Sequence, residues 1–219
     1  MTTLILSPLK LELDGLLHRL RQLDHTPVEK HVGSLKVFEF PALRLQLSLA
    51  GHGKTQFALQ TQFFIDRLQP QAVVCAGCAG ALDSRLAIGD VVVAEQTIEH
   101  DFRERFRPRP EPEFAGDAKW IARARGLNPS QFKIHFGKIA SGDEDIIDSA
   151  RAEELVAQTQ ALAVAWEGAG GARACLFNRV PFLEIRGVTD NADHSAVVDF
   201  KKNLQTAMAN IADVILQLL

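Results

Sequence analysis

The sequence predicts an α/β fold with a largely parallel or mixed central sheet. Short apolar runs alternate with segments of helical spacing along almost the whole chain, which is typical of this class. Two of the runs, residues 72–76 and 91–94, are uninterrupted, as in strands covered on both faces. The sequence has no repeat and no low-complexity segment, so we expect residues 1–219 to form a single domain.

The remaining elements follow from the same periodicity. Further strands are expected at residues 4–7, 31–40, 43–49, 132–140, 162–165 and 182–188. Helices are expected over residues 9–20, from Gly53 to Leu68, over 167–177, and at the end of the chain, where an apolar stripe runs from Phe200 to Leu218. Residues 102–113 are rich in Arg and Pro and predict an irregular loop.

Composition excludes several classes of partner. Of the 219 residues, 47% are hydrophobic, which is ample for a core. The net charge of −3 gives no indication of binding to nucleic acid or to an anionic membrane. The longest nearly apolar run, residues 72–82, is well below the ~20 residues of a membrane span. We expect no signal peptide, and three cysteines without framework spacing fit a cytoplasmic protein. We expect neither a cofactor nor a metal.

Polar residues follow the predicted strands, where ligands bind in open α/β sheets. Glu12, Glu167 and Asp190 each come shortly after a strand, and two glycine-rich turns, residues 51–53 and 75–80, follow two others. Cleavage of an N-glycosidic bond needs an acid for the departing base, a base for the attacking group, and a carboxylate for the sugar hydroxyls. Each residue also has a structural alternative: Glu12 favours its helix dipole, Glu167 caps its helix, and Asp190 forms an Asx turn.

Five successive motifs are similar to those of the 5′-methylthioadenosine/S-adenosylhomocysteine nucleosidases. They are Gly51-His52-Gly53-Lys54 with Ala58, Gly77-Cys78-Ala79-Gly80, Gly89-Asp90-Val91-Val92, Trp166-Glu167-Gly168-Ala169 and Arg186 through Asp193. Their order and spacing match over nearly the whole chain. The resemblance implies a three-layer α/β/α fold with a mixed, partly barrel-like sheet, as in nucleoside phosphorylases, and a homodimer.

The resemblance also implies roles for individual residues. Asp190 would protonate N7 of the leaving adenine, Glu12 would orient the attacking water, and Glu167 would bind the ribose 2′- and 3′-hydroxyls. Phe200 is expected against the nucleoside, just before the C-terminal helix. The other substrate-binding positions are Trp166, Cys78, Gly80 and Ile146.

Departures from the family pattern leave the substrate open. Trp166 stands where the family usually has methionine, Cys78 where serine is common, and Asp145 where an aromatic residue usually contacts the base. Futalosine hydrolase and purine nucleoside phosphorylase are therefore alternatives. A phosphorylase would need a cation for phosphate, for which Arg85 is a candidate and Lys10 a weaker one.

The remaining motifs give weaker indications of function. Gly53-Lys54-Thr55 resembles the end of a P-loop, but Ser48 stands where that motif needs glycine. Cys75 and Cys78 have the spacing of a redox pair, but we interpret them as small core residues. We expect His100 to be a solvated histidine in a loop. The alternating arginines of residues 103–109 fit a solvated loop, or a lid over an anionic substrate. A non-enzymatic binding role would not require Glu12, Glu167 and Asp190 together.

Overall fold

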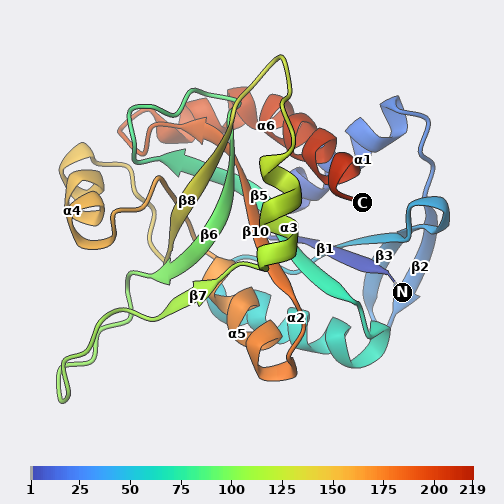
Figure 1. The fold of residues 1–219 in the computed structure, drawn as a ribbon, viewed down its shortest axis with the longest axis horizontal. Helices are drawn as coiled ribbons and strands as arrows, with labels where there is room; N and C mark the ends of the chain where they lie inside the picture. The colour runs from blue at the N-terminus through green and yellow to red at the C-terminus, as the bar shows by residue number, and fades with distance from the viewer. Residues whose placement is uncertain (1) are drawn as a thin grey trace.

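Strands and helices alternate along the chain, as predicted, in a computed structural model that describes residues 2–219 (Figure 1). The strands are β1 (Thr3–Ser7), β2 (Val28–Val32), β3 (Leu35–Phe40), β4 (Leu45–Leu49), β5 (Ala72–Ala81), β6 (Val91–Glu99), β7 (Glu113–Ala115), β8 (Ile134–Ser141), β9 (Ala163–Ala165) and β10 (Phe182–Asp190). The helices are α1 (Lys10–Gln22), α2 (Lys54–Leu68), α3 (Ala118–Arg125), α4 (Ser149–Thr159), α5 (Gly168–Asn178) and α6 (Ala196–Leu218), with a 3-10 turn at Pro41–Leu43.

The ten strands found within residues 2–219 belong to one mixed sheet, part of which closes on itself. The strand order is β10-β6-β8-β9-β5-β1-β4-β3-β2, with β7 beside β6. β5 also pairs in parallel with β10, and this extra pairing closes β5, β10, β6, β8 and β9 into a ring. β1, β4, β3 and β2 extend from that ring as an open wing. The mixed, partly barrel-like sheet inferred from the family resemblance is confirmed.

Helices cover both faces of the sheet and complete three layers (Figure 1). α1 and α6 pack against each other on one face, and α2 and α5 pack against each other on the opposite face. The packing of β1 explains why its apolar run is uninterrupted. Ile5 packs in the core cluster that includes α1 and α6, whereas Leu4 and Leu6 pack in the cluster that includes α2 and α5. A strand buried on both faces needs apolar residues at every position.

Several predicted boundaries were wrong for local reasons. Residues 31–40 do not form one strand, because Gly33, with φ of 59°, turns the chain between β2 and β3. Helices α3 and α4 were missed, although each has an N-cap aspartate, Asp117 and Asp148, whose side chain accepts backbone N–H bonds. The last helix begins at Ala196, so Phe200 lies inside α6 and not just before it.

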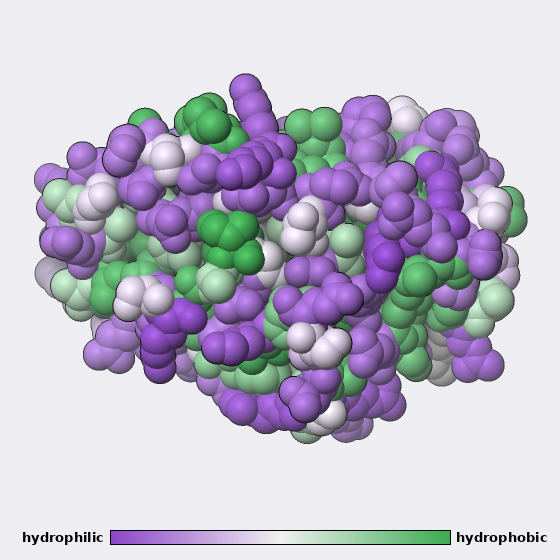
Figure 2. Space-filling model, turned by 90° about the horizontal axis from the view of Figure 1, so that it is seen from above, coloured by the Kyte–Doolittle hydropathy of each residue, from purple (hydrophilic) through white to green (hydrophobic). Residues whose placement is uncertain are grey.

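The molecular surface is mostly hydrophilic on the face seen in Figure 2, where hydrophobic side chains form small, separate groups. Within residues 2–219, no helix combines the length and the apolar character needed to cross a membrane. Exposed large hydrophobic side chains occur elsewhere on α2 and α5, among them Leu59, Leu176 and Phe177.

Candidate active site

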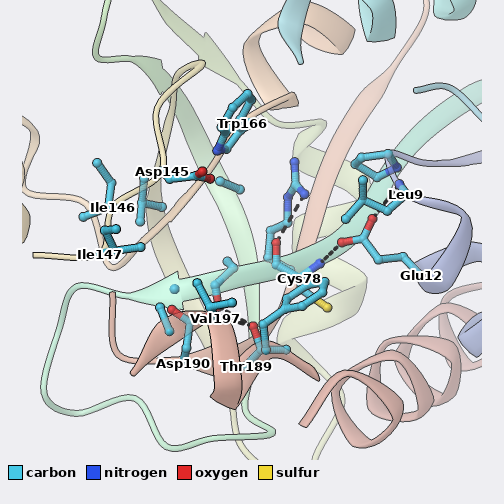
Figure 3. Close-up of a pocket in the computed structure, with 18 of the residues that line it drawn as sticks. Leu9, Glu12, Cys78, Asp145, Ile146, Ile147, Trp166, Thr189, Asp190 and Val197 are labelled. Atoms are coloured by element: carbon cyan, nitrogen blue, oxygen red, sulfur yellow. Dashed lines mark hydrogen bonds between the residues drawn. The ribbon is translucent and has the colours of Figure 1, made fainter. Parts of the chain in front are cut away.

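A cavity of about 290 Å³ lies where β1, β5, β9 and β10 end and where α6 begins. In Figure 3, Trp166 and Asp145 lie on one side of it, Glu12 and Leu9 lie across from them, and Asp190 and Thr189 lie at a third side. The cavity brings together the eight residues to which the family resemblance gave a catalytic or substrate-binding role: Glu12, Cys78, Gly80, Ile146, Trp166, Glu167, Asp190 and Phe200.

Glu12 projects from the first turn of α1 into the floor of this cavity and is 2% exposed. Its Oε2 accepts a hydrogen bond from the Leu9 backbone N–H at 2.9 Å, and its Oε1 accepts one from the Cys78 N–H at 2.7 Å (Figure 3). Burial, reinforced by the nearby charge of Glu167, raises the pKa of Glu12 to about 7. Its position therefore combines a helix-terminal contact with a carboxyl group that titrates near neutral pH.

The approach of Glu12 to β5 depends on Gly77. A Cβ at this position would lie 2.8 Å from Oε1 of Glu12 and 2.8 Å from a guanidinium nitrogen of Arg186. The glycine-rich segment predicted as a turn is instead part of β5, which continues to Ala81. The glycines of this strand let charged side chains pack directly against its extended backbone. Their role is therefore to make room for those side chains and not to turn the chain.

Asp190 ends β10 opposite Gly80 of β5. Its Oδ2 accepts a hydrogen bond from the Thr189 hydroxyl at 2.8 Å, and its Oδ1 accepts the Ala192 N–H at 3.0 Å. The second contact is the Asx-type turn considered above, so Asp190 has a structural role whatever its chemistry. Burial raises the pKa of Asp190 above its ordinary value, which favours the protonated form.

Glu167 stands at the N-terminus of α5, but its side chain does not cap that helix. Its Oε2 lies 3.3 Å from Nη2 of Arg186, and its Oε1 lies 3.0 Å from Nδ1 of His52. Burial by itself would raise the pKa of Glu167, but the His52 hydrogen bond and the Arg186 charge outweigh it and hold that pKa below its ordinary value. Glu167 and Glu12 therefore differ in protonation although both are buried.

Arg186 also lines the cavity, although the sequence motif that contains it predicted no role for it. It is 1% exposed and lines the cavity from β10. Its guanidinium donates to Oε1 of Glu184 at 2.8 Å, to the Cys78 carbonyl at 3.3 Å and to Glu167. Two charged residues, Glu184 and Arg186, within an apolar strand sequence were the available signal of a buried ion pair.

Other singled-out residues lie away from the cavity. Arg85 has a side chain 76% exposed and pairs with Asp83, while Lys10 is exposed and pairs with Asp14. Lys54 is held by Glu99 and Asp101 in an ion-pair cluster. The arginine-bearing loop, residues 102–112, contributes no lining residue to this cavity within the described chain.

Two further sequence interpretations concern side chains that are buried. His100 is fully buried, so the prediction of a solvated loop histidine was wrong. Burial lowers its pKa. Cys75 and Cys78 are free, buried thiols of β5, and burial raises the pKa of both thiols well above the ordinary range. Neither thiol has the solvent access of a reactive cysteine.

A mixed sheet closed by β5 and β10, with Glu12, Glu167, Asp190 and the buried Arg186 around one cavity, defines an α/β enzyme of the nucleoside phosphorylase-like class. The comparisons with known proteins agree. The chain belongs to the phosphorylase superfamily, whose family model matches residues 2–219.

The similar proteins are nucleosidases and a hydrolase of this superfamily. A 5′-methylthioadenosine/S-adenosylhomocysteine nucleosidase from Exiguobacterium sp. is 30% identical over 177 residues, which is 76% of each chain. The structure of the Helicobacter pylori nucleosidase of that name, with butyl-thio-DADMe-Immucillin-A, has a TM-score of 0.88 and 26% identity, covering 98% of this chain and 96% of the other. Futalosine hydrolase of the same organism also has a TM-score of 0.88 and 26% identity, covering 100% and 97%.

Proposed function

We propose that this protein hydrolyses the N-glycosidic bond of a purine nucleoside of the adenosine type, such as 5′-methylthioadenosine or S-adenosylhomocysteine, and releases the base. The observation that carries the proposal is the convergence of Glu12, Glu167 and Asp190 on one cavity. The named nucleosidases among the relatives support the same substrate class.

Each acidic residue has a distinct part in the proposed reaction. Asp190, whose pKa burial raises, donates a proton to N7 of the base as the C1′–N9 bond breaks. Glu12 accepts a proton from the water whose oxygen bonds to the anomeric carbon. Glu167, held as a carboxylate, accepts hydrogen bonds from the 2′- and 3′-hydroxyls. The products are the free base and the free sugar.

The charge around the anomeric site supports water over phosphate as the attacking group. Arg186 is the buried cation of the cavity lining, and its charge is already matched by Glu184 and Glu167, with Glu12 close by. Arg85 and Lys10, the two residues that the sequence suggested for binding phosphate, are both exposed and paired with aspartates. A phosphate dianion here would meet more negative than positive charge.

Futalosine hydrolysis is the second candidate. The structural similarity to a futalosine hydrolase equals the similarity to the nucleosidases. Trp166 and Asp145, which depart from the nucleosidase pattern, both line the cavity and give it an aromatic ring and a carboxyl group that this pattern does not predict. Both candidates share the bond cleaved, the N-glycosidic bond of a purine nucleoside.

The test is base release from a panel of substrates. Purified protein is incubated with 5′-methylthioadenosine, S-adenosylhomocysteine and futalosine, and free base is detected by chromatography. We expect release from at least one of them and the strongest from the physiological substrate. If no purine nucleoside yields free base, the proposed function is wrong.

We also propose that residues 1–219 act as a single cytoplasmic domain that forms a homodimer. One sheet containing all ten strands supports the single domain. Three free cysteines fit a reducing compartment. The exposed Leu59, Leu176 and Phe177 (84% exposed) on the adjacent helices α2 and α5 would be covered by a second copy.

A further inference from the structure

The hydrogen bond between His52 and Glu167 has no part in the reaction steps proposed above. His52 lies between β4 and α2, lines the same cavity, and has a half-exposed side chain. Its Nδ1 is 3.0 Å from Oε1 of Glu167. Because an ionised carboxylate can accept but not donate, Nδ1 must carry the proton and donate it.

Three contacts join residues 52 and 53 to residues 166 and 167. The His52 ring stacks on the Trp166 ring, with centroids 4.1 Å apart and planes inclined by 28°. Besides the imidazole, the Gly53 backbone N–H donates to Oε1 of Glu167 at 3.3 Å. The φ of Gly53 is 84°, which a glycine adopts without strain. The stack fixes the plane of the imidazole and therefore the direction of its N–H.

Each oxygen of Glu167 has its own partner. His52 and Gly53 bind Oε1, and Arg186 binds Oε2. The residue is 3% exposed, so water cannot replace a lost partner without cost. With both oxygens held, the carboxylate has one orientation and retains acceptor positions for hydroxyl groups in the cavity.

We propose that His52 is a positioning residue, which, braced by Trp166, fixes the Glu167 carboxylate for recognition of the ribose hydroxyls. This inference rests on the proposed function and deepens it. The imidazole does not touch the reacting bond. It sets how strongly the enzyme distinguishes a ribonucleoside from the corresponding 2′-deoxynucleoside.

The test compares two variants that separate hydrogen bonding from stacking. H52F retains an aromatic ring against Trp166 and removes the donor, whereas H52N removes the ring and retains an amide N–H near the position of Nδ1. For a ribonucleoside substrate we expect KM to rise about tenfold in H52F with little change in kcat, the effect of one charged hydrogen bond. KM for the 2′-deoxynucleoside should change less, and H52N should restore most of the discrimination.

The possible outcomes separate this inference from the proposed function. Unchanged KM values in H52F, or an equal loss in H52F and H52N, would overturn the positioning role while base release by the wild type stands. Absence of base release by the wild type would overturn the proposed function and this inference with it. Should H52F fail to fold, the smaller H52L serves as the variant without a donor.

Discussion

Replacing Glu12 by glutamine should reduce activity and should raise the stability of the variant relative to the wild type as the pH rises through neutral. The carboxyl group is buried, and its pKa of about 7 compares with an ordinary value of 4.5. Because the pKa of Glu12 is higher in the folded than in the unfolded protein, the contribution of its carboxyl group to folding stability is fully present below pH 4.5. It is lost as the pH rises through about 7.

The size of the effect follows from that shift. Since one pKa unit corresponds to about 1.36 kcal/mol, the rise from 4.5 to about 7 represents roughly 3 kcal/mol of folding free energy. At pH 5, Glu12 in the folded protein is mostly protonated, and each of its oxygens still accepts a backbone N–H, from Leu9 or from Cys78, whereas the amide nitrogen of glutamine cannot accept one. E12Q should therefore lose one of these hydrogen bonds at both pH values, and its unfolding free energy relative to the wild type should rise by roughly 2–3 kcal/mol between pH 5 and pH 8.

Urea unfolding at pH 5 and pH 8 measures the stability difference, and base release measures activity. We expect kcat to fall about 10²- to 10⁴-fold in E12Q, because a general base is lost. We also expect the wild-type rate to increase as the pH rises through about 7, where Glu12 ionises. The reasoning is refuted if the stability difference is the same at both pH values, or if E12Q retains the wild-type rate.

Three further predictions concern the other acidic residues and the assembly. D190N should lose about 10²- to 10⁴-fold in turnover, while nucleoside binding survives within about tenfold. The control variant D193N, at a nearby aspartate outside the cavity lining, should stay active. Comparable rates in both variants would leave Asp190 with a structural role in its turn and no catalytic one. 2′-Deoxynucleosides should be poor substrates because Glu167 loses a hydroxyl partner, so equal kcat/KM for ribo and deoxy forms would remove Glu167 from that role. Sedimentation at micromolar concentration should give a dimer, and a species of monomer mass alone would count against the homodimer.

Much of this site could be predicted because its signals are local. Glu12, Glu167 and Asp190 each follow a recognisable apolar strand, and the carboxyl ends of these strands meet at one edge of the sheet. The two helices that were missed, α3 and α4, are short, with 8 and 11 residues, and bury few of their side chains. Local patterning therefore identified the acidic residues better than the peripheral helices.

The closure of the sheet and the inner ion pairs could not be predicted in the same way. The pairing of β5 with β10 joins segments more than 100 residues apart, as the register of Val73 with Phe182 illustrates, and no local pattern specifies it. This pairing brings Arg186 beside Cys78 and Glu167. His100 was predicted to be solvated because a loop histidine with a single acidic neighbour usually is, whereas Asp101 is paired with Lys54 and the histidine is buried.

The dependence of base release on phosphate tests the hydrolytic function most directly. The nucleoside is incubated in phosphate-free buffer and again with millimolar phosphate, and the sugar product is identified. Because Arg186 is already paired with Glu184 and Glu167, we predict equal rates and free sugar in both conditions. Strict dependence on phosphate, with the sugar 1-phosphate as product, would contradict hydrolysis while leaving the acidic residues in place around the nucleoside.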